Sequence, residues 1–361
     1  MGINHGELCE AGHMRTINVS SIHSVPWLRQ FPNGIPEWND WRFIFNAENE
    51  AYDYLVVFDE LHAPVTPNCP RKNIIHISTE PPLVRRYDDK FLSQFAWTIR
   101  QGEEASIKGA IFHQPGLSWY IGWKPGEAQS KETLGFFEIK SLFDTPKTKL
   151  ISVISSNVRV SAQHRARLRF AQKLKKHYGP MIDFFGRGFA SMEDKLIALK
   201  DYRFHVVLEN SVFDHYFSEK LSDCILAGAY PIYYGCNNID KYFPDNSYQR
   251  INIHDFDSAI KTINNAIEKD FDKKFRQERL NARDLVLNKH NIFPMLIDII
   301  GNIEEGKYGA PKKLTIMPLG QYKPAPKKGI RLLIHLKFVK LANQYKIFDL
   351  LREFYIKIFR S

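Results

Sequence analysis

The second half of the chain alternates strand-like and helix-like segments, and this alternation constrains the fold more than any other feature. Residues 149–155 (KLISVIS) have the composition of a buried strand, residues 162–177 have helical spacing, and residues 181–185 (MIDFF) resemble the next strand. The plan repeats at residues 205–208, 218–227 and 231–234, with Gly228 closing the helix. Such repetition predicts a parallel sheet with right-handed crossovers. We therefore expect residues 146–300 to form a Rossmann-like nucleotide-binding domain.

The first half also contains strand-like runs, at residues 15–22 (RTINVSSI), 54–58 (YLVVF), 73–77 (NIIHI) and 95–99 (FAWTI). Each run is short, rich in Val, Ile and aromatic residues, and bounded by polar or Pro-containing turns. We assign residues 14–145 to a first domain. Residues 1–13 show no periodicity and precede a second methionine, Met14, so we expect a leader or tag there.

Composition excludes several classes of protein. With 361 residues, 44% of them hydrophobic, the chain can bury a sizeable core and is long enough for two domains. The sequence contains no run of 18 apolar residues that would predict a membrane span, and no apolar segment near the N-terminus that would predict a secretory signal. The four cysteines form no CxxC pair, which argues against a structural zinc site or a disulfide framework. We expect a cytoplasmic protein.

The positive charge of the chain is concentrated in residues 323–361. Ten Lys or Arg and two acids give this segment +8 of the net +10, so the remainder carries only +2 and does not by itself indicate a nucleic-acid partner. Within residues 301–361 we expect a linker and then a basic amphipathic helix, because apolar residues recur at helical spacing from Ile330 to Ile358. Such a helix can lie on an anionic membrane surface. The alternative is a helix that packs on the protein body or on a second subunit.

Two loops are the best candidates for a binding site. In open α/β sheets ligands bind beyond the carboxyl ends of the strands, and here residues 156–163 and 209–218 leave strands and enter helices. The first helix carries Arg165, Arg167 and Arg169, and the second begins with Glu219 and Lys220. A helix N-terminus favours an anion, and a lysine in its first turn adds a full charge. We predict a phosphate site there.

Other short motifs are weak or missing. The chain has neither GxxxxGK[ST] nor GxGxxG, so a P-loop ATPase and a dinucleotide dehydrogenase are unsupported. The triplet Gly186-Arg187-Gly188 is as compatible with a turn as with a binding loop. The pattern Asp255-Phe256-Asp257 could suggest a metal-bound diphosphate, but Asp257 before Ser258 is adequately explained as a helix N-cap.

Residues 202–243 (YRFHVVLENSVFDHYFSEKLSDCILAGAYPIYYGCNNIDKYF) resemble the signature of the α-1,3/4-fucosyltransferases, glycosyltransferase family 10. The helix 166–174 with residues 183–188 (DFFGRG) is similar to the family's arginine helix and following strand, and residues 78–81 (STEP) are similar to its N-terminal E-S-P motif. The resemblance implies a GT-B fold, in which two Rossmann-like domains face each other across a cleft. The C-terminal domain would hold a GDP-sugar and the N-terminal domain the acceptor.

The resemblance also implies roles for single residues. Glu80 would take the proton of the attacking hydroxyl, and Lys220 and Arg167 would stabilise the leaving diphosphate, with Arg165 and Arg169 kept as alternatives to Arg167. Glu219 would contact the donor sugar, and Asn210 and Tyr216 would line the nucleotide pocket. No metal or other cofactor would be required, because Lys and Arg replace it.

Three further positions of the signature are open at this point. Glu209 ends a hydrophobic strand and is interpreted as structural, accepting backbone N–H groups of the following loop. His215 could contact the donor, although a lone loop histidine more often faces solvent. The family's usual residues are replaced by Leu208 before Glu209 and by Phe217-Ser218 before Glu219, which leaves the identity of the donor sugar open.

The function implied is an inverting glycosyltransferase that moves fucose from GDP-fucose to a hydroxyl of a glycan. We expect the glycan to be a bacterial surface polysaccharide or lipopolysaccharide, and a lipid-linked acceptor would fit an enzyme that residues 323–361 hold on the inner face of the cytoplasmic membrane. A second hypothesis keeps the fold and changes the nucleotide-sugar donor. A third is a non-catalytic basic module that binds membrane or nucleic acid, but it leaves residues 202–243 unexplained. The sequence leaves a homo-oligomer open.

Overall fold

The computed structural model describes residues 14–80, 84–102, 108–124, 133–157, 162–303 and 314–322. Residues up to Pro318 form one compact unit, and Leu319–Ser361 are a second unit. The expectations for the leader 1–13 and for the tail 323–361 fall outside the described residues and stay predictions. Within the described part, no helix combines the length and the apolar character needed to cross a membrane.

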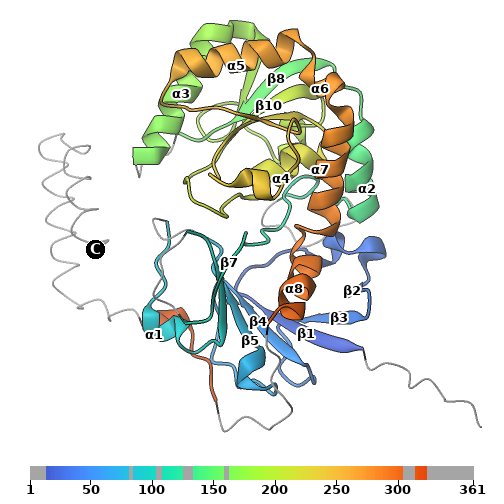
Figure 1. The fold of residues 1–361 in the computed structure, drawn as a ribbon, viewed down its shortest axis with the longest axis vertical. Coiled ribbons are helices and arrows are strands. Elements are labelled where there is room, and N and C mark those ends of the chain that lie inside the picture. Colours follow the sequence, from blue (N-terminus) through green and yellow to red (C-terminus); the bar gives the residue numbers. More distant parts are fainter. Residues whose placement is uncertain are drawn as a thin grey trace, which may run out of the picture. The chain divides into compact units, whose positions relative to one another are not determined.

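The first unit contains a mixed sheet that is parallel except at one edge (Figure 1). Its strands are, in spatial order, β2 (Glu37–Trp38), β3 (Trp41–Phe45), β1 (Arg15–Ser20), β4 (Tyr54–Phe58), β5 (Ile74–Ile77), β6 (Trp97–Arg100) and β7 (Ala110–Phe112). Only β2 and β3 pair in the antiparallel sense. The central strand β4 is buried at every residue, as expected for a parallel strand covered on both faces. A short helix, α1 (Asp89–Leu92), precedes β6.

The second sheet is parallel throughout and matches the predicted alternation closely. Its strands are β12 (Gln249–Arg250), β11 (Tyr230–Tyr234), β10 (Tyr202–Leu208), β8 (Lys149–Ile154) and β9 (Ile182–Phe185). One apolar cluster joins the sheet to α3 (Ala162–Tyr178) and α5 (Phe256–Glu268), followed by α6 (Phe271–Lys274). A second cluster joins it to α2 (Phe136–Ser141), α4 (Glu219–Leu226) and α7 (Arg276–Asn288). The sheet is therefore enclosed between two helical layers, as Figure 1 shows. The predicted α/β fold with two Rossmann-like halves is confirmed.

The division of the chain between the halves differs from the predicted boundaries at residues 145 and 300. Helix α8 (Ile292–Gly301) was assigned by sequence to the second domain, yet Phe293 stacks on Phe31 with ring centroids 3.8 Å apart, inside the core of the first sheet. Conversely, α2 precedes residue 145 but buries Phe136 and Ile139 in the second half. Both differences have one cause: an apolar face packs where complementary surface is available, not where the chain is nearest.

Candidate functional site

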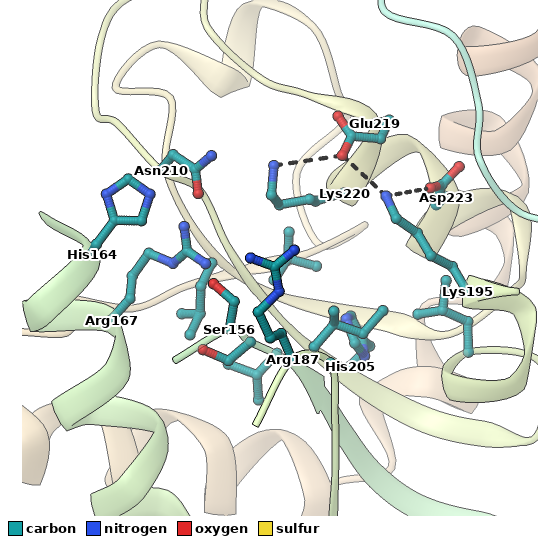
Figure 2. A pocket seen from close by; sticks show the side chains of 17 residues that line it. Ser156, His164, Arg167, Arg187, Lys195, His205, Asn210, Glu219, Lys220 and Asp223 are labelled. Atoms are coloured by element: carbon teal, nitrogen blue, oxygen red, sulfur yellow. Dashed lines mark hydrogen bonds and ion pairs between the residues drawn. The ribbon is translucent and has the colours of Figure 1, made fainter. Parts of the chain in front are cut away.

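Two adjoining pockets lie where the second sheet faces the first. The sheet-edge pocket has a volume of about 380 Å³ and lies at the carboxyl ends of β8 and β10 (Figure 2). The inter-sheet pocket has a volume of about 350 Å³ and is lined by residues of both halves, among them Glu80 from the first and Tyr216 from the second. Four residues line both pockets and make them one continuous site: Lys195, Asn210, Glu219 and Lys220.

The loops of the sheet-edge pocket have the sharp turns that bring backbone close to a ligand. Gly186 follows β9 with φ at +108°, and a Cβ there would stand 2.2 Å from the carbonyl oxygen of Ser155. No side chain fits at that distance, so the glycine is required by the approach of the two loops. Its neighbour Arg187 lines the pocket. The first two residues of the triplet, Gly186 and Arg187, are therefore part of the pocket wall and not only a turn.

Arg167 is the most unusual residue of the sheet-edge pocket. Its side chain comes from α3 and is 5% exposed, yet its Nε and Nη1 atoms have no hydrogen-bond partner among the described residues. Burial lowers the pKa of Arg167, and Glu209 opposes this effect. Arg165 and Arg169 do not line either pocket, and Arg169 is exposed. A buried guanidinium without a partner costs free energy, which an anionic ligand would recover.

Other cations converge on the same space. In Figure 2 the side chains of Arg167, Arg187 and Lys220 point toward the middle of the pocket. Lys220 lies in the first turn of α4, whose N-cap Ser218 accepts the Lys220 N–H at 3.3 Å. The pocket thus combines a helix N-terminus with guanidinium and ammonium groups, an arrangement suited to a diphosphate.

Glu209 fixes the N-terminus of α4 through the N-cap residue Ser218. Its carboxylate is fully buried and accepts the Ser218 N–H at 2.8 Å and the Ser218 hydroxyl at 2.7 Å, while the Lys220 ammonium lies 3.4 Å away. Glu209 lines neither pocket. The structural interpretation of Glu209 is therefore confirmed by its contact with the backbone of the following loop.

Glu80 stands three residues beyond β5 and faces the second half across the inter-sheet pocket. The Tyr216 hydroxyl donates to its Oε2 at 3.3 Å, and Lys220 lines the same pocket. Burial raises the pKa of Glu80 above its usual range, and the Lys220 charge opposes the shift. Tyr216 lies on the wall of this pocket, where its hydroxyl is directed at Glu80, and its contact with the nucleotide stays a prediction. Asn210 lines both.

Several residues of the signature serve packing. Phe217 is 3% exposed, lies outside both pockets and packs edge-on against Tyr242 with ring centroids 5.1 Å apart. Its bulk therefore does not narrow the site. Leu208, in contrast, lines the sheet-edge pocket. The His215 Nδ1 lies 2.6 Å from the Tyr242 hydroxyl, and the residue lines neither pocket, so it is neither a pocket residue nor a freely solvated one.

The DxD pattern does not take part in the site. Asp255, and not Asp257, is the N-cap of α5 and accepts the Ser258 N–H at 3.1 Å; the helix starts two residues earlier than predicted. Neither aspartate lines the two pockets. Within the described ranges, no group of three His, Cys, Asp or Glu side chains could hold a metal ion.

Two groups were missed by sequence reasoning. Lys195 lies 3.0 Å from Glu219 Oε1 and 3.2 Å from Asp223 Oδ2 and lines both pockets. On the other side of the inter-sheet pocket, His23 is held by the buried Asp59, with Nε2 and Oδ2 2.7 Å apart. Neither Lys195 nor His23 belongs to a recognised motif, and only the fold brings them to the site.

Comparison with known proteins gives a match for the second half. Residues 144–273 match the model of the glycosyltransferase family 10 (fucosyltransferase) C-terminal domain. A bovine 3-galactosyl-N-acetylglucosaminide 4-alpha-L-fucosyltransferase is 30% identical over 143 residues, 38% of this chain and 35% of the relative. Mouse 4-galactosyl-N-acetylglucosaminide 3-alpha-L-fucosyltransferase 9 is 29% identical over 164 residues, 43% and 44% of the two chains. The matches thus span less than half the length of these relatives.

A search of solved structures finds an alpha1,3-fucosyltransferase crystal structure with a TM-score of 0.47 and 14% sequence identity. The superposition covers 86% of this chain and 95% of that one.

Proposed function

We propose, from the match of residues 144–273 to the C-terminal domain model of glycosyltransferase family 10, that the protein transfers fucose from GDP-fucose to a hydroxyl group of a glycan. The observation that carries the proposal is the buried guanidinium of Arg167, whose Nε and Nη1 atoms find no partner in the part of the chain that the structure describes. It lies in a cationic pocket that adjoins a carboxylate supplied by the other half of the fold. A diphosphate would partner Arg167 and Lys220, and the sugar would lie between these cations and Glu80.

The proposed reaction is a single displacement with inversion. Glu80 takes the proton of the acceptor hydroxyl as its oxygen forms a bond to C1 of fucose. The bond from C1 to the phosphate oxygen breaks at the same time, and GDP leaves with that electron pair. Because the base comes from the first half and the cations from the second, attack and departure take place on opposite sides of C1. The positive charge of Arg167 and Lys220 stabilises the leaving diphosphate.

The donor is tested by thermal stabilisation. A ligand at 100 times its Kd stabilises the folded protein by about 2.7 kcal/mol, which corresponds to a rise in Tm of about 4 °C for a chain of this size. We expect this rise with GDP-fucose and GDP, with EDTA present, and a smaller one with UDP-sugars. An equal rise with GDP-mannose, together with transfer of mannose, would favour the second hypothesis of a different donor sugar, for which the Leu208 replacement is the remaining argument.

For the acceptor we propose a bacterial surface glycan carried on a lipid at the inner face of the cytoplasmic membrane. The +8 charge of residues 323–361 supports this proposal, because basic segments are attracted to anionic lipid. Sedimentation with vesicles of phosphatidylglycerol should retain the protein at low salt, and removal of residues 323–361 should release it without loss of transfer to a soluble acceptor. Loss of transfer to soluble acceptors would contradict this division of roles.

The pH dependence of the proposed reaction follows from Glu80. The base must be ionised, and burial raises its pKa above 4.5, so kcat/KM should fall with decreasing pH below an apparent pKa higher than that value. The Tyr216 hydroxyl donates to the ionised carboxylate and lowers its pKa. Tyr216→Phe should therefore move the acidic limb to higher pH, measured from kcat/KM profiles. An unmoved limb would mean that a different group titrates.

A further inference from the structure

Lys195 connects three segments that meet at the site. It begins a 3-10 turn (Lys195–Ala198), and Figure 2 shows its ammonium between the carboxylates of Glu219 and Asp223. The same ammonium lies 4.7 Å from the ring centroid of Tyr120, which lines the inter-sheet pocket. The Lys195 side chain is 21% exposed, so these contacts are largely shielded from solvent.

Asp223 extends the connection to the first half of the chain. It is fully buried, and its Oδ1 accepts the backbone N–H of Tyr120 at 2.9 Å and that of Ile121 at 3.4 Å. Glu219 and Asp223 are one helical turn apart on α4, so two carboxylates face the same side at close quarters. The Lys195 ammonium between them compensates this repulsion.

The two lysines beside Glu219 have different partners. Lys195 is 3.0 Å from Glu219 Oε1, whereas Lys220 is 3.6 Å away and donates to the Ser218 hydroxyl at 2.9 Å. Burial alone would raise the pKa of Glu219, but Lys195 and then Lys220 outweigh it and lower the pKa to about 2. Because Lys195 holds Glu219, Lys220 can turn to a diphosphate without leaving that carboxylate uncompensated.

We propose that Lys195 is a positioning residue that orients the Glu219 carboxylate toward the hydroxyls of the donor sugar and, through Asp223, fixes Tyr120 beside the acceptor. The proposal rests on the proposed function and adds a division of labour between two lysines: Lys195 serves the sugar side of the donor, and Lys220 the phosphate side. The proposal predicts that loss of Lys195 lowers kcat/KM for GDP-fucose but leaves the affinity for GDP unchanged.

The competing explanation is a buried ion pair that only stabilises the fold. Lys195→Met leaves Asp223 buried without a cation, so the single variant alone cannot separate the two explanations. Lys195→Met/Asp223→Asn removes that carboxylate, and the side-chain oxygen of the introduced amide can still accept the Tyr120 N–H. Lys149→Met is the control, since Lys149 makes a largely exposed pair with Asp183 at 3.8 Å in the same half.

In the double variant we expect a Tm within about 3 °C of the wild-type value, because the uncompensated charge of Asp223 is gone. The GDP affinity should stay within about twofold, while kcat/KM for GDP-fucose stays about 10²-fold below wild type, because a carboxylate without its orienting partner loses the geometry of the contact. Recovery of turnover together with Tm would overturn the positioning role. Failure of the wild-type protein to bind GDP would instead overturn the proposed function, and this proposal with it.

A second measurement does not require the Lys195→Met/Asp223→Asn variant to fold. If Lys195 orients Glu219, then Lys195→Met should cost about 10²-fold in kcat/KM in the wild-type background and clearly less when Glu219 is already Gln, because only the effect through Asp223 is then left to lose. Equal costs in the two backgrounds would show that Lys195 acts independently of Glu219 and would overturn the proposal.

Discussion

Glu80→Gln is expected to lower kcat by about 10³-fold and to leave the affinity for GDP within about twofold. The amide keeps the size of the side chain and can still accept the hydrogen bond of the Tyr216 hydroxyl, so the pocket should keep its shape. What is lost is the ability to take a proton. Steady-state rates with GDP-fucose and calorimetric titration with GDP measure the two effects separately.

The control for this variant is Glu50→Gln, an exposed glutamate of the same half that pairs with Arg42 at the surface. It should not change turnover. A Glu80→Gln protein that turned over at the wild-type rate would show that Glu80 is not the base. His23, which lines the same pocket and is oriented by Asp59, would then be the next candidate for that role.

Arg167→Met is expected to weaken GDP binding by about 10²-fold without lowering the Tm of the unliganded protein. The guanidinium is 5% exposed and lacks partners for Nε and Nη1 within the described ranges, so it contributes an unfavourable desolvation term to the empty site. Methionine fills a similar volume without that term. A loss of affinity combined with an unchanged or higher Tm is the pattern of a residue kept for binding and not for folding.

The matched control is Arg169→Met, two residues along the same helix, where the side chain is exposed and lines neither pocket. It should leave the affinity for GDP unchanged, which also separates the local contact from a general loss of positive charge. Equal losses in the two variants would contradict a specific diphosphate contact at Arg167.

The second sheet was predictable because its strands and helices are local and strongly periodic. The strand expected at 149–155 is β8 (Lys149–Ile154), and the helix expected at 218–227 is α4 (Glu219–Leu226). The first sheet was less predictable. The apolar run of its strand β3 (Trp41–Phe45) is interrupted by the exposed Arg42, and β7 (Ala110–Phe112) has only three residues, so the pattern did not reveal them.

The site residues that could be predicted are those that belong to the predictable second sheet. Arg167, Asn210, Glu219 and Lys220 lie on the loops and helix starts that follow predicted strands, and they line the sheet-edge pocket as expected. Tyr216 lines the inter-sheet pocket, and the sequence pattern does not reveal the positive φ of 62° at the preceding residue, His215. Lys195 was missed because its importance arises only from the approach of α4 and the segment at Tyr120.

The return of α8 to the first sheet makes the first half discontinuous, while the second half is one continuous stretch of the chain between the two crossings. The chain crosses between them near Gln114 and again near His290, and the Gln114 side-chain amide donates to the His290 carbonyl at 3.1 Å, so the crossings run side by side. Cleavage at either crossing alone would leave one lobe without part of its interior. A protease cut at one of the two crossings therefore does not yield two separately folded fragments, and a hybrid protein that exchanges the first lobe must exchange the distant helix together with its sheet.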